Sequence, residues 1–214
     1  MTLIDSTILF VKQQLQQAEG GHDWFHIERV YKNALLLAKE EDCNLEIVKL
    51  GALLHDIADS KFHDGDEKIG PKIARDFLVT QNVNENIIAP VIAIIENISF
   101  KGGNFEKKFT SKELDIVQDA DRLDAIGAIG IARTFNYGGF KNRAIYNPEI
   151  QPNLNMSIEE YKKSEAPTIN HFYEKLLLLK DKMNTKTGKK IAAERHRFME
   201  QFLAQFYAEW EGEK

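Results

Sequence analysis

The segment "NLEIVKLGALLHDIAD" at residues 44–59 carries an apolar stripe that runs into an adjacent histidine and aspartate. The apolar side chains recur at spacings of three and four, which predicts a helix with one face in a hydrophobic core. They are Ile47, Leu50, Leu53 and Leu54. His55 and Asp56 then stand side by side at the end of this helix, close to a buried floor. A carboxylate there is costly unless a cation or another partner compensates its charge.

A His–Asp pair is weak evidence by itself, because the chain has two more, at residues 22–23 and 63–64. Two further features strengthen the case for residues 55–56. His26 lies on a predicted helix upstream. Downstream, the stretch "VQDADRLDAIG" at residues 117–127 places three aspartates on a helix that is otherwise apolar. Helical spacing puts Asp121 and Asp124 on one face and points Asp119 elsewhere, so these carboxylates need cations or solvent.

Helical periodicity dominates the rest of the chain and predicts an all-α fold, a helical bundle with two C-terminal helices. Asp23 and Ser111 are the expected N-caps of two of the helices. The expected helices span residues 4–18, about 23–41, 44–59, 65–80, 84–98, 111–135, about 167–183 and about 187–211.

The segment from Tyr137 to Pro167 differs from its surroundings. It holds three of the five prolines, two adjacent glycines and little periodicity, which predicts a long loop or flap. We expect one domain over residues 1–214, with a core at about 20–136, the flap at 137–167 and a C-terminal elaboration at 168–214. The last helix repeats an aromatic residue every fourth position, and this stripe is expected to pack onto the core or onto a partner subunit in a homodimer. It comprises Phe198, Phe202, Phe206 and Trp210.

Composition narrows the class of protein. The 214 residues carry a formal net charge of −5, which argues against nucleic acid as the main partner but permits a small anionic ligand. Cys43 is the single cysteine, so no intrachain disulfide forms. No stretch approaches the roughly 18 apolar residues of a membrane span, and the first residues lack the basic start of a signal peptide. We therefore expect a cytoplasmic protein without membrane partners.

The pattern H…HD…D in this chain resembles the HD-domain superfamily of metal-dependent phosphohydrolases. Its parts are "HDWFHIERV" at residues 22–30, "LLHDIAD" at residues 53–59 and "QDADRLDAIG" at residues 118–127. The combination is most similar to the small single-domain bacterial branch. That likeness runs from about Gly21 to the C-terminus and includes "TINHFYEKLLLLKDKMNT" and "FMEQFLAQFY". Several motifs in the right order make the resemblance specific.

The resemblance implies that one divalent cation is bound by four side chains, namely His26, His55, Asp56 and Asp121. Two imidazoles and two carboxylates are a mixed nitrogen and oxygen set that suits Mn²⁺ first, with Mg²⁺, Co²⁺, Ni²⁺ and Fe²⁺ as alternatives. Enzymes of the superfamily with two metals carry extra histidines before the last aspartate. Here His63 is the single histidine between Asp56 and Asp121, so we expect a one-metal site.

The resemblance also implies roles for neighbouring residues. Asp59 matches an acidic residue that orients or deprotonates the attacking water, and Lys61 follows it as the favoured cation for phosphoryl charge. His22 is expected at the mouth of the site. Further candidates for binding substrate are Arg29, Lys101, Arg122 and Arg133. Each of these cations has an ordinary alternative role in a surface contact or an ion pair.

The resemblance to the small bacterial proteins implies hydrolysis of nucleotides, first of nucleoside or deoxynucleoside triphosphates to a monophosphate and pyrophosphate. A 5′-nucleotidase that acts on monophosphates would use the same ligands. A non-catalytic module that binds metal and nucleotide remains a third reading of the sequence. The identity of the products separates the first two, and absence of turnover with intact metal binding would indicate the third.

Overall fold

The computed structural model describes residues 1–16, 23–58, 68–98, 109–157, 160 and 163–214. Every regular element in these ranges is a helix, which confirms the predicted all-α fold. The chain forms two compact units, Met1–Asp121 and Arg122–Lys214. The boundary between them falls within one helix. The expected division into core, flap and elaboration stays a prediction.

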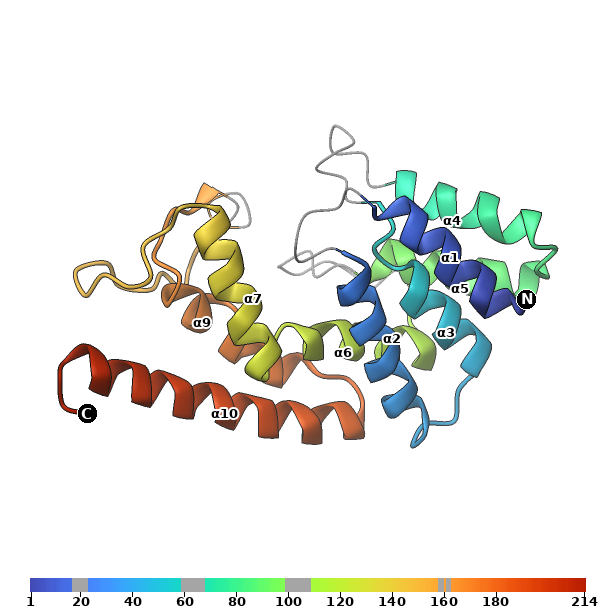
Figure 1. The fold of residues 1–214 in the computed structure, drawn as a ribbon. Coiled ribbons are helices and arrows are strands. Elements are labelled where there is room, and N and C mark those ends of the chain that lie inside the picture. Colours follow the sequence, from blue (N-terminus) through green and yellow to red (C-terminus); the bar gives the residue numbers. More distant parts are fainter. Residues whose placement is uncertain (17–22, 59–67, 99–108, 158–159, 161–162) are drawn as a thin grey trace. The chain divides into compact units, whose positions relative to one another are not determined.

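The first unit contains a short helix with seven of its ten residues buried; Figure 1 shows it beside α1 and α2. This helix, α3, packs against α1, α2 and α5. Its apolar residues from Ile47 onward are buried, whereas Glu46 is exposed and Lys49 is partly exposed, so α3 has one face in the core. The unit contains α1 (Leu3–Gln14), α2 (Trp24–Ala38), α3 (Leu45–Leu54), α4 (Ile69–Thr80), α5 (Glu85–Asn97) and most of α6 (Lys112–Asp124).

Side-chain caps fix where most helices of the first unit begin; α4 has none. The Asp23 carboxylate accepts a hydrogen bond of 2.9 Å from the backbone N–H of His26, which confirms the predicted N-cap of α2. Ser111 accepts one of 3.0 Å from the N–H of Leu114 at the start of α6, again as predicted. Such caps satisfy amides that have no partner within the helix. The Asp23 cap therefore places His26 in the first turn of α2.

The second unit packs its helices through aromatic side chains. Phe202 on α10 stacks on Phe172, with ring centroids 5.8 Å apart, and the Trp210 ring lies 5.0 Å from that of Tyr146. Most of the aromatic stripe therefore makes ring contacts within its own unit, while Phe198 and Trp210 each stay half exposed. The elements are α7 (Gly127–Phe140), α9 (Asn170–Glu174), the 3₁₀ helix η2 (Leu176–Lys182) and α10 (Lys186–Trp210).

The prediction of one long helix over residues 111–135 was wrong. Helix α6 ends at Asp124 and α7 begins at Gly127, because Ile126 between them adopts an extended backbone. Gly127 has φ of +76°, in the left-handed region that favours glycine. The apolar pattern continues across this break, so periodicity alone could not reveal it. The third helix is also shorter than predicted and ends at Leu54, while α7 extends to Phe140 into the predicted flap.

No helix in the described part of the chain is both long enough and apolar enough to cross a membrane. The cytoplasmic location expected from the sequence stays a prediction.

Candidate functional site

His55 sits directly after α3, where the helix gives way to a turn. Its side chain is buried, and its Nδ1 atom lies 2.9 Å from the carbonyl oxygen of Ala52. A carbonyl oxygen only accepts, so Nδ1 carries the hydrogen and the neutral ring keeps its lone pair on Nε2. That Nε2 atom is buried and has no hydrogen-bond partner among the described residues. A buried acceptor without a partner is unusual, and an ion bound at that atom would account for it.

Burial lowers the pKa of His55, while the negative charges of Asp121 and Asp56 act in the opposite direction. The ring is therefore neutral at pH 7. A neutral imidazole with a free lone pair is the form of histidine that binds metals. The hydrogen bond to Ala52 also fixes the ring orientation, as is common for histidines at metal centres.

The described side chains of three sequence-predicted residues meet at this point of the first unit. His26, His55 and Asp56 each offer one ligand atom, and these atoms lie within 4.8 Å of one another. His26 is buried on α2, and its ring lies 5.3 Å from the His55 ring, centroid to centroid. Asp56 is partly exposed, so the cluster reaches solvent on one side.

Asp121 on α6 completes the set expected from the sequence. Its Oδ1 atom lies 3.5 Å from Nε2 of His26 and 3.9 Å from Nε2 of His55. Atoms bound about 2.1 Å from one octahedral ion are roughly 3–4 Å apart from each other. The two nitrogen–oxygen distances fall in that range. Asp121 thus lies beside both imidazoles of the group formed by His26, His55 and Asp56. Binding of one divalent cation by all four side chains stays a prediction.

The proposed cationic residues lie in different surroundings. Arg29 is half-buried on α2, one turn after His26. In the second unit, Arg122 donates to the carbonyl oxygen of Lys182 at 2.5 Å, and Arg133 contacts the Asp124 carboxylate at 2.6 Å. Substrate binding by these arginines stays a prediction. Four other predicted residues lie outside the described residues, namely His22, Asp59, Lys61 and Lys101.

Asp124 is buried, and its partner is an arginine of the same unit. Arg133 reaches both its carboxylate and its backbone carbonyl, which holds the turn between α6 and α7. Arg195 on α10 donates to the carbonyl oxygen of Leu123 at the same turn. The sequence suggested a shared face for Asp121 and Asp124, but the structure gives them different partners.

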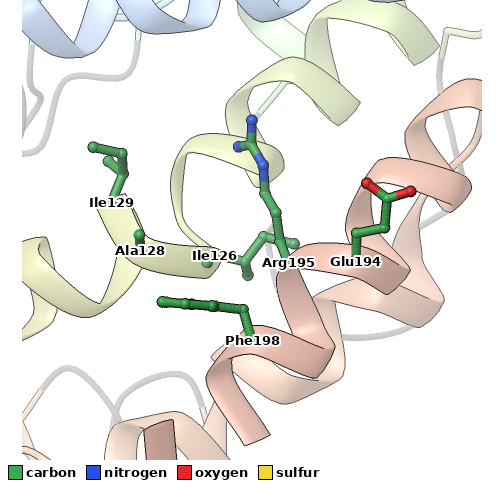
Figure 2. A pocket seen from close by; sticks show the side chains of 7 residues that line it. Ile126, Ala128, Ile129, Glu194, Arg195 and Phe198 are labelled. Carbon is green, nitrogen blue, oxygen red and sulfur yellow. The ribbon is translucent and has the colours of Figure 1, made fainter. Parts of the chain in front are cut away.

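A cavity of about 400 Å³ opens beside Arg195 in the second unit. Figure 2 shows Arg195 rising from its helix past Ile126, with Ile129 and Phe198 nearby. Its lining is mainly apolar, and none of the candidate metal ligands takes part in it. This cavity therefore does not belong to the histidine and aspartate cluster.

Comparisons with known proteins cover the part of the chain that holds the candidate ligands. The model of the HD domain matches residues 24–126, a stretch that contains all four converging side chains. The YpgQ protein of Bacillus subtilis is 39% identical over 197 residues, which covers 92% of this chain and 88% of YpgQ. The chain belongs to the HD-domain family.

Solved structures support this assignment over nearly the whole chain. The HD-superfamily hydrolase of Bacillus thuringiensis aligns with a TM-score of 0.77 and 46% identity, covering 97% of this chain and 96% of its own. The structure of Bacillus subtilis YpgQ in complex with ADP aligns with a TM-score of 0.77 and 35% identity, covering 96% and 94%. This HD protein is accordingly a hydrolase, as the sequence predicted.

Proposed function

We propose that this HD protein is a metal-dependent phosphohydrolase that converts nucleoside or deoxynucleoside triphosphates to monophosphates and pyrophosphate. The observation that carries the proposal is the cluster of His26, His55 and Asp56, with the Asp121 carboxylate 3.9 Å from the buried Nε2 of His55. The nucleotide class is supported by the related YpgQ, which was crystallised with ADP. ADP contains a phosphoanhydride bond, which favours an anhydride substrate over a monophosphate.

We propose that one divalent cation, Mn²⁺ before the other candidates, is held by His26, His55, Asp56 and Asp121. Two carboxylates balance the charge of a divalent ion when both histidines are neutral, so the loaded site carries little net charge. Bound there, the cation supplies Lewis-acid polarisation of a phosphoryl oxygen. The chain itself holds the two histidine ligands in place: the carbonyl oxygen of Ala52 orients His55, and His26 is buried beside it on α2.

In the proposed reaction, a water oxygen bonds to the α-phosphorus, and the bond from that phosphorus to the bridging oxygen breaks. The bridging oxygen leaves with pyrophosphate, and a proton of the water passes to Asp59. Lys61 offsets negative charge on the phosphoryl oxygens in the transition state. His22, Arg29, Lys101, Arg122 and Arg133 remain candidates for binding the nucleotide.

A panel of nucleotides with each candidate metal tests the proposal. Purified protein is incubated with nucleoside and deoxynucleoside mono-, di- and triphosphates, and products are separated by ion exchange and identified by ³¹P NMR. We expect pyrophosphate and a monophosphate from triphosphates, and no turnover after treatment with EDTA. Release of inorganic phosphate from monophosphates would instead indicate a 5′-nucleotidase. Metal binding without turnover of any nucleotide would refute the proposed activity.

A further inference from the structure

We infer that Asn33 is a positioning residue of the cation site, which holds the Asp121 segment of α6 in register against the His26 segment of α2. The inference rests on the proposed function, because it assigns a role toward the same cation. It concerns a side chain that belongs to none of the motifs identified in the sequence.

Asn33 lies two helical turns after His26 on α2, so the two side chains share one face of that helix. Its side-chain nitrogen donates a hydrogen bond of 3.3 Å to the carbonyl oxygen of Ala120. Ala120 immediately precedes Asp121 on α6 and is fully buried. One amide therefore ties the helix that carries His26 to the backbone from which the Asp121 carboxylate projects.

The chemistry of the contact selects an amide. The Ala120 oxygen can only accept, and the Asn33 amide nitrogen can only donate. Leucine has similar volume but no donor, and serine is too short to reach across the same gap. Loss of the contact would allow the backbone at Ala120 to shift relative to α2, within the limits set by the buried side chains of α6. Such movement would change the distance of 3.5 Å between Nε2 of His26 and Oδ1 of Asp121.

A second amide on α6 provides a matched control. Gln118 is buried, and its side chain donates a hydrogen bond of 2.9 Å to the carbonyl oxygen of Asn97 at the end of α5. Helix α5 carries none of the four proposed ligands. Gln118→Leu therefore removes a contact of the same kind from the same helix, but not the one that links two ligand-bearing helices.

The experiment measures Mn²⁺ binding to the full chain by electron paramagnetic resonance of the free ion, for wild type, Asn33→Leu, Asn33→Ser and Gln118→Leu. Thermal unfolding of each metal-free protein is recorded alongside. Changes in residues that orient metal ligands typically cost 10–100-fold in metal affinity. We expect Mn²⁺ to bind about tenfold more weakly to both Asn33 variants. Gln118→Leu should bind Mn²⁺ as the wild type does, even if its melting temperature falls as far as those of the Asn33 variants.

Three results would overturn the inference. They are wild-type affinity in Asn33→Ser, equal loss of affinity in Gln118→Leu, or a loss restored by cooling a destabilised variant well below its melting temperature. Absence of Mn²⁺ binding by the wild-type protein would refute the proposed function itself. The two failures are thus distinguishable. If Asn33→Leu does not fold, Asn33→Ser carries the comparison.

Discussion

The carboxylate of Asp121 lies 3.5 Å from the Nε2 atom of His26, although one residue belongs to α6 and the other to α2. This approach exists only after both helices have packed into the first unit. A buried histidine that faces a carboxylate suits either a hydrogen bond or a shared cation. The second buried imidazole, that of His55, lies 3.9 Å from the same oxygen and favours the cation.

Asp121→Asn should abolish most of the activity without unfolding the chain. The substitution keeps the volume of the side chain but removes a negative charge that the cation requires. We expect kcat/KM for the preferred nucleotide to fall at least about 100-fold, roughly 3 kcal/mol of lost transition-state stabilisation. Circular dichroism should remain that of the wild type. Asp76→Asn on α4 is the control, and a similar loss there would show that the effect is not specific to the site.

Mn²⁺ should stabilise the protein, and His55→Gln should remove that effect. A ligand at 100 times its Kd stabilises the folded state by about 2.7 kcal/mol. For a chain of this size the melting temperature should rise by roughly 5–10 °C. Differential scanning calorimetry with and without MnCl₂ makes the measurement. An equal rise in His55→Gln would mean that manganese binds elsewhere.

Gly127→Ala should destabilise the second unit, whereas Gly139→Ala should not. Gly127 has φ of +76°, and an added Cβ would lie 3.0 Å from the Cβ and Cγ atoms of Arg195. A left-handed backbone with a side chain costs about 1–2 kcal/mol before that crowding is added. At Gly139, within α7, an added Cβ meets nothing within 4 Å, and alanine is the better helix former by about 1 kcal/mol. Chemical denaturation of the two variants should shift in opposite directions, and a shift of the same sign would contradict the described turn.

The second unit should lose stability on acidification through His171. Burial, together with the positive charges of Lys175 and Arg143, lowers the pKa of His171 to about 3. Below about pH 6.5 His171 is therefore protonated in the unfolded chain but stays neutral in the folded chain. The free energy of unfolding consequently falls as the pH drops from 6.5 toward 3. The slope from one such group is at most about 1.4 kcal/mol per pH unit, and it is smaller near pH 6.5, where the unfolded ring is only partly protonated.

His171→Gln isolates this contribution from that of the carboxylates. Urea unfolding is followed between pH 7 and pH 5 for both proteins. The free energy of unfolding should fall more steeply with decreasing pH for the wild type than for the variant over that interval. Parallel pH profiles would show that His171 is as easily protonated in the folded chain as in the unfolded one.

The sequence predicted the all-α class and the presence of the helices of the first unit, because their apolar side chains recur with the helical period. Asp23 and Ser111 were recognisable as caps, since capping depends on neighbours only a few residues away. The break at Gly127 was missed, because it depends on a left-handed backbone that leaves no trace in the apolar pattern.

Some features of the candidate site could likewise be predicted from the sequence, and others could not. His26, His55, Asp56 and Asp121 were found through a resemblance, and their approach in space depends on helices that pack far along the chain from one another. The partner of Asp124 could not be inferred, because Arg133 and other cations are equally plausible by spacing. The role of Asn33 left no motif, since one hydrogen bond to a backbone oxygen can be made from many positions.

Crystals grown with saturating MnCl₂, with diffraction recorded at the manganese absorption edge, test the central claim most directly. The account predicts one anomalous peak, about 2.0–2.3 Å from a nitrogen of His26, Nε2 of His55 and carboxylate oxygens of Asp56 and Asp121. A map without a peak among these four side chains, or with its peak at another set of residues, would contradict it.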